Sequence, residues 1–242
     1  MPVSIEGPTA AGAAAWTVLV AATAFLVSWL FANRLRLGRS AYVGVLVAVT
    51  AAVSTAYVLA VDGDVGDLLA LRSLRGLAGG LVVGAVTATA MRRMPATLHR
   101  TRRQRVAAAG WEGVVYGIAE GVLLSALPAL VAWQGAEALG WEGTSARVTR
   151  WTAALLASAF VIVVHHLGYW EYRNRMLVPI TVACSLLTVA YLVTGSVLAP
   201  VVGHVLMHLA AIRHGTELPP HVRPAAVGAS GRELTSVGGG AR

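Results

Sequence analysis

Six ionisable side chains stand inside the long apolar stretches of this 242-residue sequence, and they are confined to three of those stretches. They are Glu112 and Glu120 in the first, His165 and His166 in the second, and His204 and His208 in the third. An ionisable side chain is costly to place in hydrocarbon, so where one occurs it marks a functional site with a partner. The set predicts acid–base chemistry or ligand binding inside a membrane.

The spacing of the histidines narrows that chemistry. His204 and His208 are four residues apart and therefore share one face of a helix. That arrangement suits two ligands to one metal ion, and it suits equally two donors aimed at one substrate oxygen. His165 and His166 are adjacent, which places them about 100° apart around a helix. Only one of them is expected to face a shared pocket, and the sequence leaves open which one.

Depth is a second reason to group these residues. Counted inward from the arginine-rich helix ends at the rise of an α-helix, Glu120 lies roughly 13–18 Å deep, His204 roughly 12 Å, and His166 and His208 roughly 6 Å. Three helices thus place polar groups in the same half of a bilayer, where we expect them to form one pocket. Glu112 lies nearer the helix end and is expected to be a solvated terminal residue.

The elements that must position these residues are apolar helices. The sequence is 57% hydrophobic and 12% charged, whereas about a quarter of the residues are charged in a soluble domain. Apolar runs long enough to approach or reach the roughly 20 residues of a bilayer span occur at 11–32, 41–61, 76–91, 108–133, 151–170, 176–199 and 201–212. We therefore predict an all-α membrane bundle of about seven transmembrane helices over 11–212. A short tail precedes it at 1–10, and a Gly- and Pro-rich tail follows at 213–242 that is expected to be disordered.

Orientation follows from the arginines. All nineteen basic residues are arginine; with the N-terminus outside, fifteen fall on the inner side and four on the outer. This bias predicts an N-out, C-in multi-pass protein of the cell membrane. The Ala-, Val- and Gly-rich composition is typical of a GC-rich bacterial genome, so the bacterial inner membrane is the expected location. The segment 92–105 is interpreted as a basic loop that sets this topology.

Other classes of function are disfavoured. The net charge of +8 is scattered in short clusters without an aromatic platform, so nucleic acid is not an expected partner. The single cysteine, Cys184, excludes an internal disulfide and a thiolate metal cluster. It is expected to be a small buried side chain. Membrane lipid is the partner that the composition itself implies.

Over residues 108–212 the chain resembles the CPBP family, the group of CAAX-protease and bacteriocin-processing (Abi) intramembrane proteases. That family carries Glu-Glu-x-x-x-Arg, Phe-x-x-x-His and His-x-x-x-Asn on three successive helices. Glu120 matches the first glutamate, His166 matches the second motif with Ile162 in place of Phe, and His204 opens the third. The sequence departs from the pattern in three further places: Gly121 replaces the second glutamate, Leu124 and Ser125 stand where the arginine is expected, and His208 replaces the asparagine.

The resemblance implies a hydrolase, a glutamate-dependent intramembrane endopeptidase that cleaves a membrane-associated protein or peptide. Glu120 would activate a water together with His166, and His204 and His208 would stabilise the oxyanion. Three alternatives remain open. The first is a metal- or haem-binding protein with His166, His204 and His208 as ligands, and Glu120 as a further ligand to a divalent metal. The others are an inactive relative that acts as a binding scaffold, and a transporter that relays protons through these groups.

Overall fold

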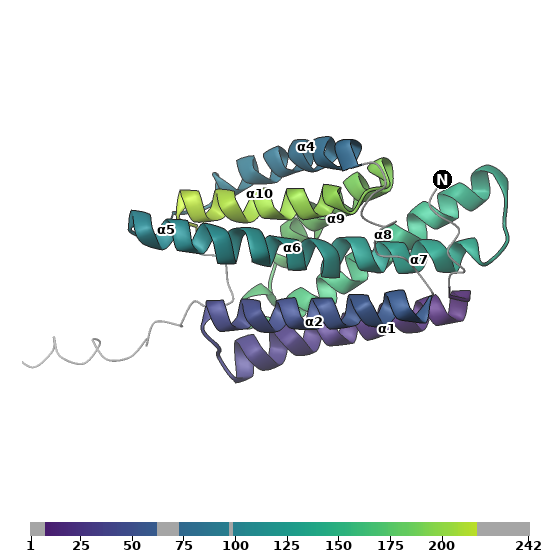
Figure 1. Cartoon of the computed structure of the whole chain (residues 1–242), viewed down its shortest axis with the longest axis horizontal. Coiled ribbons are helices and arrows are strands. Elements are labelled where there is room, and N and C mark those ends of the chain that lie inside the picture. Colours follow the sequence, from purple (N-terminus) through teal and green to yellow (C-terminus); the bar gives the residue numbers. More distant parts are fainter. Residues whose placement is uncertain (1–7, 62–72, 97–98, 217–242) are drawn as a thin grey trace, which may run out of the picture.

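A computed structural model describes residues 8–61, 73–96 and 99–216 of the chain. It confirms the all-α class, because the described residues form helices joined by short connections, with no strand among them. The helices run roughly along one long axis of the molecule (Figure 1). In chain order the elements are α1 (Ala10–Leu26), η1 (Val27–Arg34), α2 (Arg39–Ala60), α4 (Ser73–Met91), α5 (Arg102–Ala108), η2 (Ala109–Val115), α6 (Tyr116–Glu120), η3 (Gly121–Ala126), α7 (Leu127–Glu137), α8 (Gly143–Leu167), η4 (Trp170–Tyr172), α9 (Leu177–Thr194) and α10 (Leu198–His214).

Six of the described helices are long and apolar enough to cross a membrane, which makes the chain a membrane protein by length and composition. They are Ala10–Arg34, Arg39–Ala60, Ser73–Met91, Arg102–Glu137, Gly143–Leu167 and Leu177–Thr194. The seventh predicted span corresponds to α10, which has 17 residues and is short beside the roughly 20 that a bilayer requires. The number of crossings therefore stays a prediction. Most of the predicted C-terminal tail lies outside the described residues.

The fourth long helix begins earlier than the sequence predicts. Its first residue is Arg102, inside the segment interpreted as a basic loop. A capping box explains the start: the Thr101 hydroxyl accepts a hydrogen bond from the Gln104 backbone N–H, and the Gln104 side chain accepts one from the Thr101 N–H. This reciprocal pairing satisfies two of the free N–H groups at the helix start. The helix then continues through α5, η2, α6, η3 and α7 to Glu137.

Segments from both halves of the sequence meet at one end of the bundle. Arg39 and Arg100 both pair with Glu112, with nitrogen–oxygen distances of 3.1 and 2.8 Å. Glu112 is thus an ion-paired residue, mostly buried, rather than the solvated terminal residue that the sequence predicts. The Asn33 side chain donates to the Gly168 carbonyl at the same end. We call this the arginine-rich end; its described segments are 34–39, 92–96, 99–105 and 168–175.

α10 is held between two stripes of glycines, each with members four residues apart. One stripe is Gly76, Gly80 and Gly84 on α4, and the other is Gly113, Gly117 and Gly121 on the fourth long helix. A Cβ added at Gly117 would stand 2.7 Å from the Cα of Val205, and one at Gly121 would stand 2.7 Å from the Cα of Val201. Small residues allow membrane helices to approach this closely. Figure 1 shows α10 lying alongside α4.

The fourth helix changes its hydrogen-bond pattern twice, at the π-helical segments η2 and η3. Pro128 is the second residue of α7, which follows η3, and it has no N–H to offer the Leu124 carbonyl, four residues before it. The Ser158 hydroxyl on α8 donates to that carbonyl instead, over 2.8 Å. A side chain from a neighbouring helix thus satisfies a backbone group that the proline leaves free.

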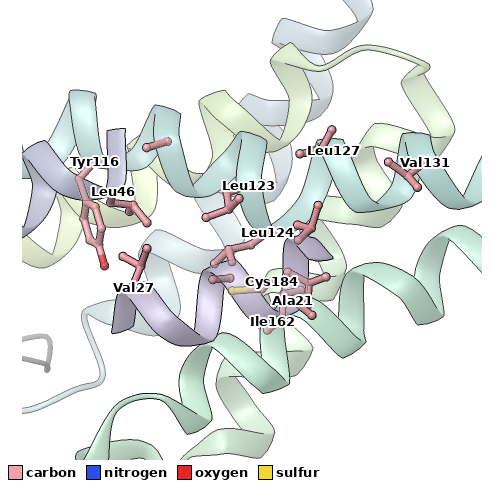
Figure 2. Packing of buried hydrophobic residues seen from close by; sticks show 14 of the residues in the cluster. Ala21, Val27, Leu46, Tyr116, Leu123, Leu124, Leu127, Val131, Ile162 and Cys184 are labelled. Carbon is pink, nitrogen blue, oxygen red and sulfur yellow. The ribbon is translucent and has the colours of Figure 1, made fainter. Parts of the chain in front are cut away.

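The apolar core lies between the fourth helix, α1, α2, α8 and α9. Figure 2 shows Leu123, Leu124 and Leu127 of the fourth helix packed among residues of the other helices. Cys184 of α9 lies in the same cluster and is 3% exposed. This confirms that its side chain is buried, as the sequence predicts. Glu120 stands on the fourth helix between Tyr116 and Leu123, so the core surrounds the candidate site.

Candidate functional site

Glu120 is buried at a point where its helix is irregular. It is the last residue of α6, the π segment η3 begins at Gly121, and its side chain is 7% exposed. π-helical turns are rare and are often found at functional sites, because the wider turn displaces side chains from regular helical positions. Placing a carboxyl group in the centre of an apolar bundle requires partners that satisfy its oxygens.

His208 is the main partner of Glu120. Its Nε2–H donates to Glu120 Oε2 over 2.7 Å, joining residues 88 positions apart in the sequence. The close approach of α10 to the fourth helix at Gly117 and Gly121 makes this contact. The imidazole also packs against the ring of Tyr116, with centroids 4.7 Å apart. A charge-assisted hydrogen bond of this length is among the stronger ones in proteins.

His204 lies one helical turn from His208 and is fully buried. Its ring is nearly parallel to that of His208, with centroids 6.3 Å apart. Among the described residues, neither ring nitrogen of His204 has a hydrogen-bond partner, and Nδ1 of His208 has none either. Buried polar atoms are nearly always paired in native proteins. Unpaired nitrogens beside a buried carboxylate are therefore positions at which a polar ligand or water would gain hydrogen bonds.

His165 is the histidine of α8 that faces Glu120. Its Nε2 lies 3.8 Å from Glu120 Oε1, within ion-pair range but too far for a hydrogen bond. Its Nδ1–H donates to the Ala24 carbonyl of α1 over 3.0 Å, and the Tyr169 hydroxyl lies 3.1 Å from its Nε2. The sequence left open which of the adjacent histidines points inward, and this geometry favours His165.

His166, which the resemblance implies as the partner of Glu120, bonds within its own helix. Its Nδ1–H donates to the Ile162 carbonyl over 2.7 Å, and its ring packs edge-on against those of His165 and Tyr172, both with centroids 5.2 Å away. No hydrogen bond or ion pair joins it to Glu120 in the part of the chain that the structure describes. His166 therefore lies beside the site without contacting the carboxylate.

Two tyrosines that the sequence analysis did not single out extend the site. The hydroxyl of Tyr169, just beyond α8, is hydrogen-bonded to that of Tyr42 on α2, and both side chains are at most 1% exposed. Burial raises the pKa of the Tyr169 phenol well above its ordinary value, so it remains protonated. The spacing did hold a signal, because Tyr169 stands four residues after His165 and so follows it on one helix face.

The packing explains one departure from the family pattern. A glutamate at position 121 does not fit, because even a Cβ there would meet the backbone of Val201 at 2.7 Å. Ser125, where the resemblance would place an arginine, is fully buried, and its hydroxyl has no hydrogen-bond partner among the described residues. The hydrogen-bond partner of Glu120 in this structure is His208 on α10.

The residues foreseen as metal ligands are only partly brought together. Glu120 and His208 are in contact, and His204 follows them on α10, whereas His166 is turned toward Ile162 and Tyr172. Over residues 8–61, 73–96 and 99–216, no group of three or more His, Cys, Asp or Glu side chains has the arrangement of a metal site.

No protein-family model matches this chain, and neither a curated protein nor a solved structure resembles it significantly.

Proposed function

We propose that the chain is a divergent, glutamate-dependent intramembrane endopeptidase that cleaves a membrane-associated protein or peptide. The observation that supports this function best is the buried Glu120 carboxylate, held by His208 beside the unpaired ring nitrogens of His204. Hydrolysis of an amide needs a base that deprotonates water and a donor that meets the developing oxyanion. Glu120 and His204 meet those two needs.

In this mechanism Glu120 takes a proton from a water, and the resulting hydroxide attacks the scissile carbonyl. An N–H of His204 donates to the oxyanion of the tetrahedral intermediate. Glu120 then returns the proton to the leaving amine, and the amide bond breaks. His208 keeps the carboxylate oriented through Nε2, which differs from the oxyanion role that the resemblance implied for it. His166, implied as the partner in water activation, supports the ring of His165 instead.

The site is closed to bulk solvent in this structure, since Glu120 is buried and His204 is fully buried. A substrate therefore has to enter by displacing a helix, and α10 is the element whose movement would uncover both histidines. We place the protein in the bacterial inner membrane, N-terminus outside, with the site in the inner half. The arginine bias of the sequence supports this placement.

The test does not require a known substrate. The wild-type chain and Glu120→Gln are expressed in a bacterial host, and new protein N-termini in the membrane fraction are quantified by mass spectrometry. We expect N-termini that the wild type produces and that fall at least about tenfold in Glu120→Gln, since a general base contributes about 10²–10⁴-fold to a rate. Glu137→Gln, a matched change at the half-exposed partner of Arg150, is expected to retain them. Identical N-termini from wild type and Glu120→Gln would overturn the proposal.

A further inference from the structure

A continuous series of polar contacts extends from Glu120, beginning at Oε1, the carboxylate oxygen that His208 does not contact. From Glu120 Oε1 the series passes to His165 Nε2 at 3.8 Å, from there to the Tyr169 hydroxyl at 3.1 Å, and then to the Tyr42 hydroxyl. Tyr42 stands three residues after Arg39, the first residue of α2, which is ion-paired to Glu112 at the arginine-rich end. The series thus runs from the carboxylate to within one helical turn of that end.

The hydrogen-bond partners determine the direction of each donor. A carbonyl oxygen only accepts, so the contact with Ala24 places a proton on His165 Nδ1. In the neutral imidazole Nε2 is then the acceptor, and the Tyr169 hydroxyl donates to it. With its proton so used, the Tyr169 oxygen accepts from the Tyr42 hydroxyl. The two hydroxyl donors, of Tyr42 and Tyr169, therefore point along the series toward Glu120.

From this geometry we infer that Tyr42, Tyr169 and His165 form a proton relay between the arginine-rich end and Glu120. Tyr42 is fully buried, so the relay requires a water to reach its hydroxyl from that end, one helical turn away. In one passage Tyr42 takes a proton from this water and gives its own to Tyr169, which gives its own to His165 Nε2. The imidazolium passes that proton to Glu120 Oε1 and becomes neutral again. One proton enters at Tyr42 for each one that reaches the carboxylate, and no other bond changes. The last gap of 3.8 Å closes when one of the two side chains moves.

The relay gives His165 and Tyr169 a role as positioning residues. It deepens the proposed function, on which it rests, because the same contacts run in reverse remove a proton from Glu120 and restore the carboxylate that acts as the base while the site is closed to bulk water. A buried carboxylate without such a path exchanges protons only when the bundle opens. The relay itself can be measured without any substrate, so its failure and the failure of the peptidase proposal are separate results.

The experiment uses the full chain in lipid nanodiscs with ¹⁵N-labelled histidine. The proton between His208 Nε2 and Glu120 is identified by the loss of its NMR signal in His208→Asn, and its replacement by deuterium is timed after transfer into D₂O. We expect exchange to slow at least tenfold in Tyr169→Phe and in Tyr42→Phe, which retain the aromatic rings and lose the hydroxyls. Tyr191→Phe on α9, away from these contacts, should exchange at the wild-type rate.

The ¹⁵N shifts of His165 give a second readout that a merely structural role for Tyr169 would not produce. They should show a proton on Nδ1 and a hydrogen-bonded, unprotonated Nε2, and the Nε2 shift should move in Tyr169→Phe. Wild-type exchange in Tyr169→Phe, with the His208 signal intact, would overturn the relay. A neutral His165 with its proton on Nε2 would overturn it as well. If Tyr169→Phe does not fold, Tyr42→Phe decides the matter in the same way.

Discussion

Glu120 and His208 act as one unit, and each explains why the other is tolerated in an apolar core. Removing one member of a buried charged pair costs about 3–5 kcal/mol, because the remaining charge has no partner. The cost falls if the remaining group takes or loses a proton. This coupling distinguishes a true pair from two polar residues that are close by accident.

A double-mutant cycle tests the pair. We expect His208→Ala to lower the free energy of unfolding by up to about 3 kcal/mol, and Glu120→Gln in the same chain to restore part of it, because no buried charge is then left. His208→Asn, which keeps an amide donor, should cost less than His208→Ala. Unfolding can be followed with a thiol-reactive fluorogenic dye, because the single cysteine, Cys184, is buried in the folded chain. Additive effects of His208→Ala and Glu120→Gln would contradict the coupling.

The sequence predicted which side chains gather and could not predict how they pair. Glu120, His204 and His208 were selected because they are costly in an apolar helix, and the structure brings Glu120 and His208 into contact. The choice between His165 and His166 depends on the rotation of α8 against α1, and the contact with Ala24 that reveals it spans 141 residues. Tyr169 follows His165 at helical spacing, but nothing in the sequence marks Tyr42 as its partner, because tyrosines near helix ends are ordinary in membrane proteins.

At the scale of the helices, the site depends most on the position of α10. It carries His204 and His208, and the two glycine stripes fix its distance from α4 and from the fourth long helix. The sequence predicted a helix here but gave no sign of its neighbours, because glycines four residues apart show that something packs closely without showing what. The sequence also gives no sign of the π segments around Glu120, because a π segment is defined by its backbone hydrogen bonds and not by its composition.

The glycine contacts predict a sharp difference between two similar substitutions. Gly117→Ala places a methyl group 2.7 Å from the Cα of Val205, so α10 has to shift, and we expect a loss of about 1–3 kcal/mol. The same shift should weaken the bond between His208 and Glu120. Gly110→Ala, in the same helix but with nothing within 4 Å of the added carbon, is expected to be neutral or slightly stabilising. The Cys184 dye assay compares the two, and equal unfolding of both variants would show that the packing at Gly117 is looser than described.

For the molecule as a whole, the arginine-rich end gives the bundle a direction. Cytoplasmic loops of membrane proteins carry an excess of arginine and lysine, and the described segments of this end include Arg36, Arg93 and Arg103, all exposed. The opposite end presents exposed Trp141 and the half-exposed Glu137, paired with Arg150. The orientation that the sequence predicts therefore means that the arginine-rich end faces the cytoplasm and the end with Trp141 and Glu137 faces outside.

Cysteine labelling in intact cells tests the orientation. In a Cys184→Ala background, Glu142→Cys is expected to react with a membrane-impermeant maleimide added outside, because both its exposed position and its end of the bundle face outward. Arg103→Cys, equally exposed at the arginine-rich end, should react only after the cells are opened. Labelling of Arg103→Cys in intact cells would reverse the orientation. It would also place the buried carboxylate nearer the outer surface than the inner one.

The π segment η3 changes the side of the fourth helix on which the residues after it lie, relative to those before it. Gly121 and Gly135 are 14 residues apart, so a regular helix turning about 100° per residue would place them about 40° apart, on nearly the same side. A single π turn adds a residue without adding rotation and so changes that angle by about another 100°. Gly121 accordingly meets α10, whereas Gly135 meets Ala13 of α1. One helix serves two different neighbours, and the same residues wound as a regular α-helix would place both glycines on nearly the same side and leave one neighbour without its contact.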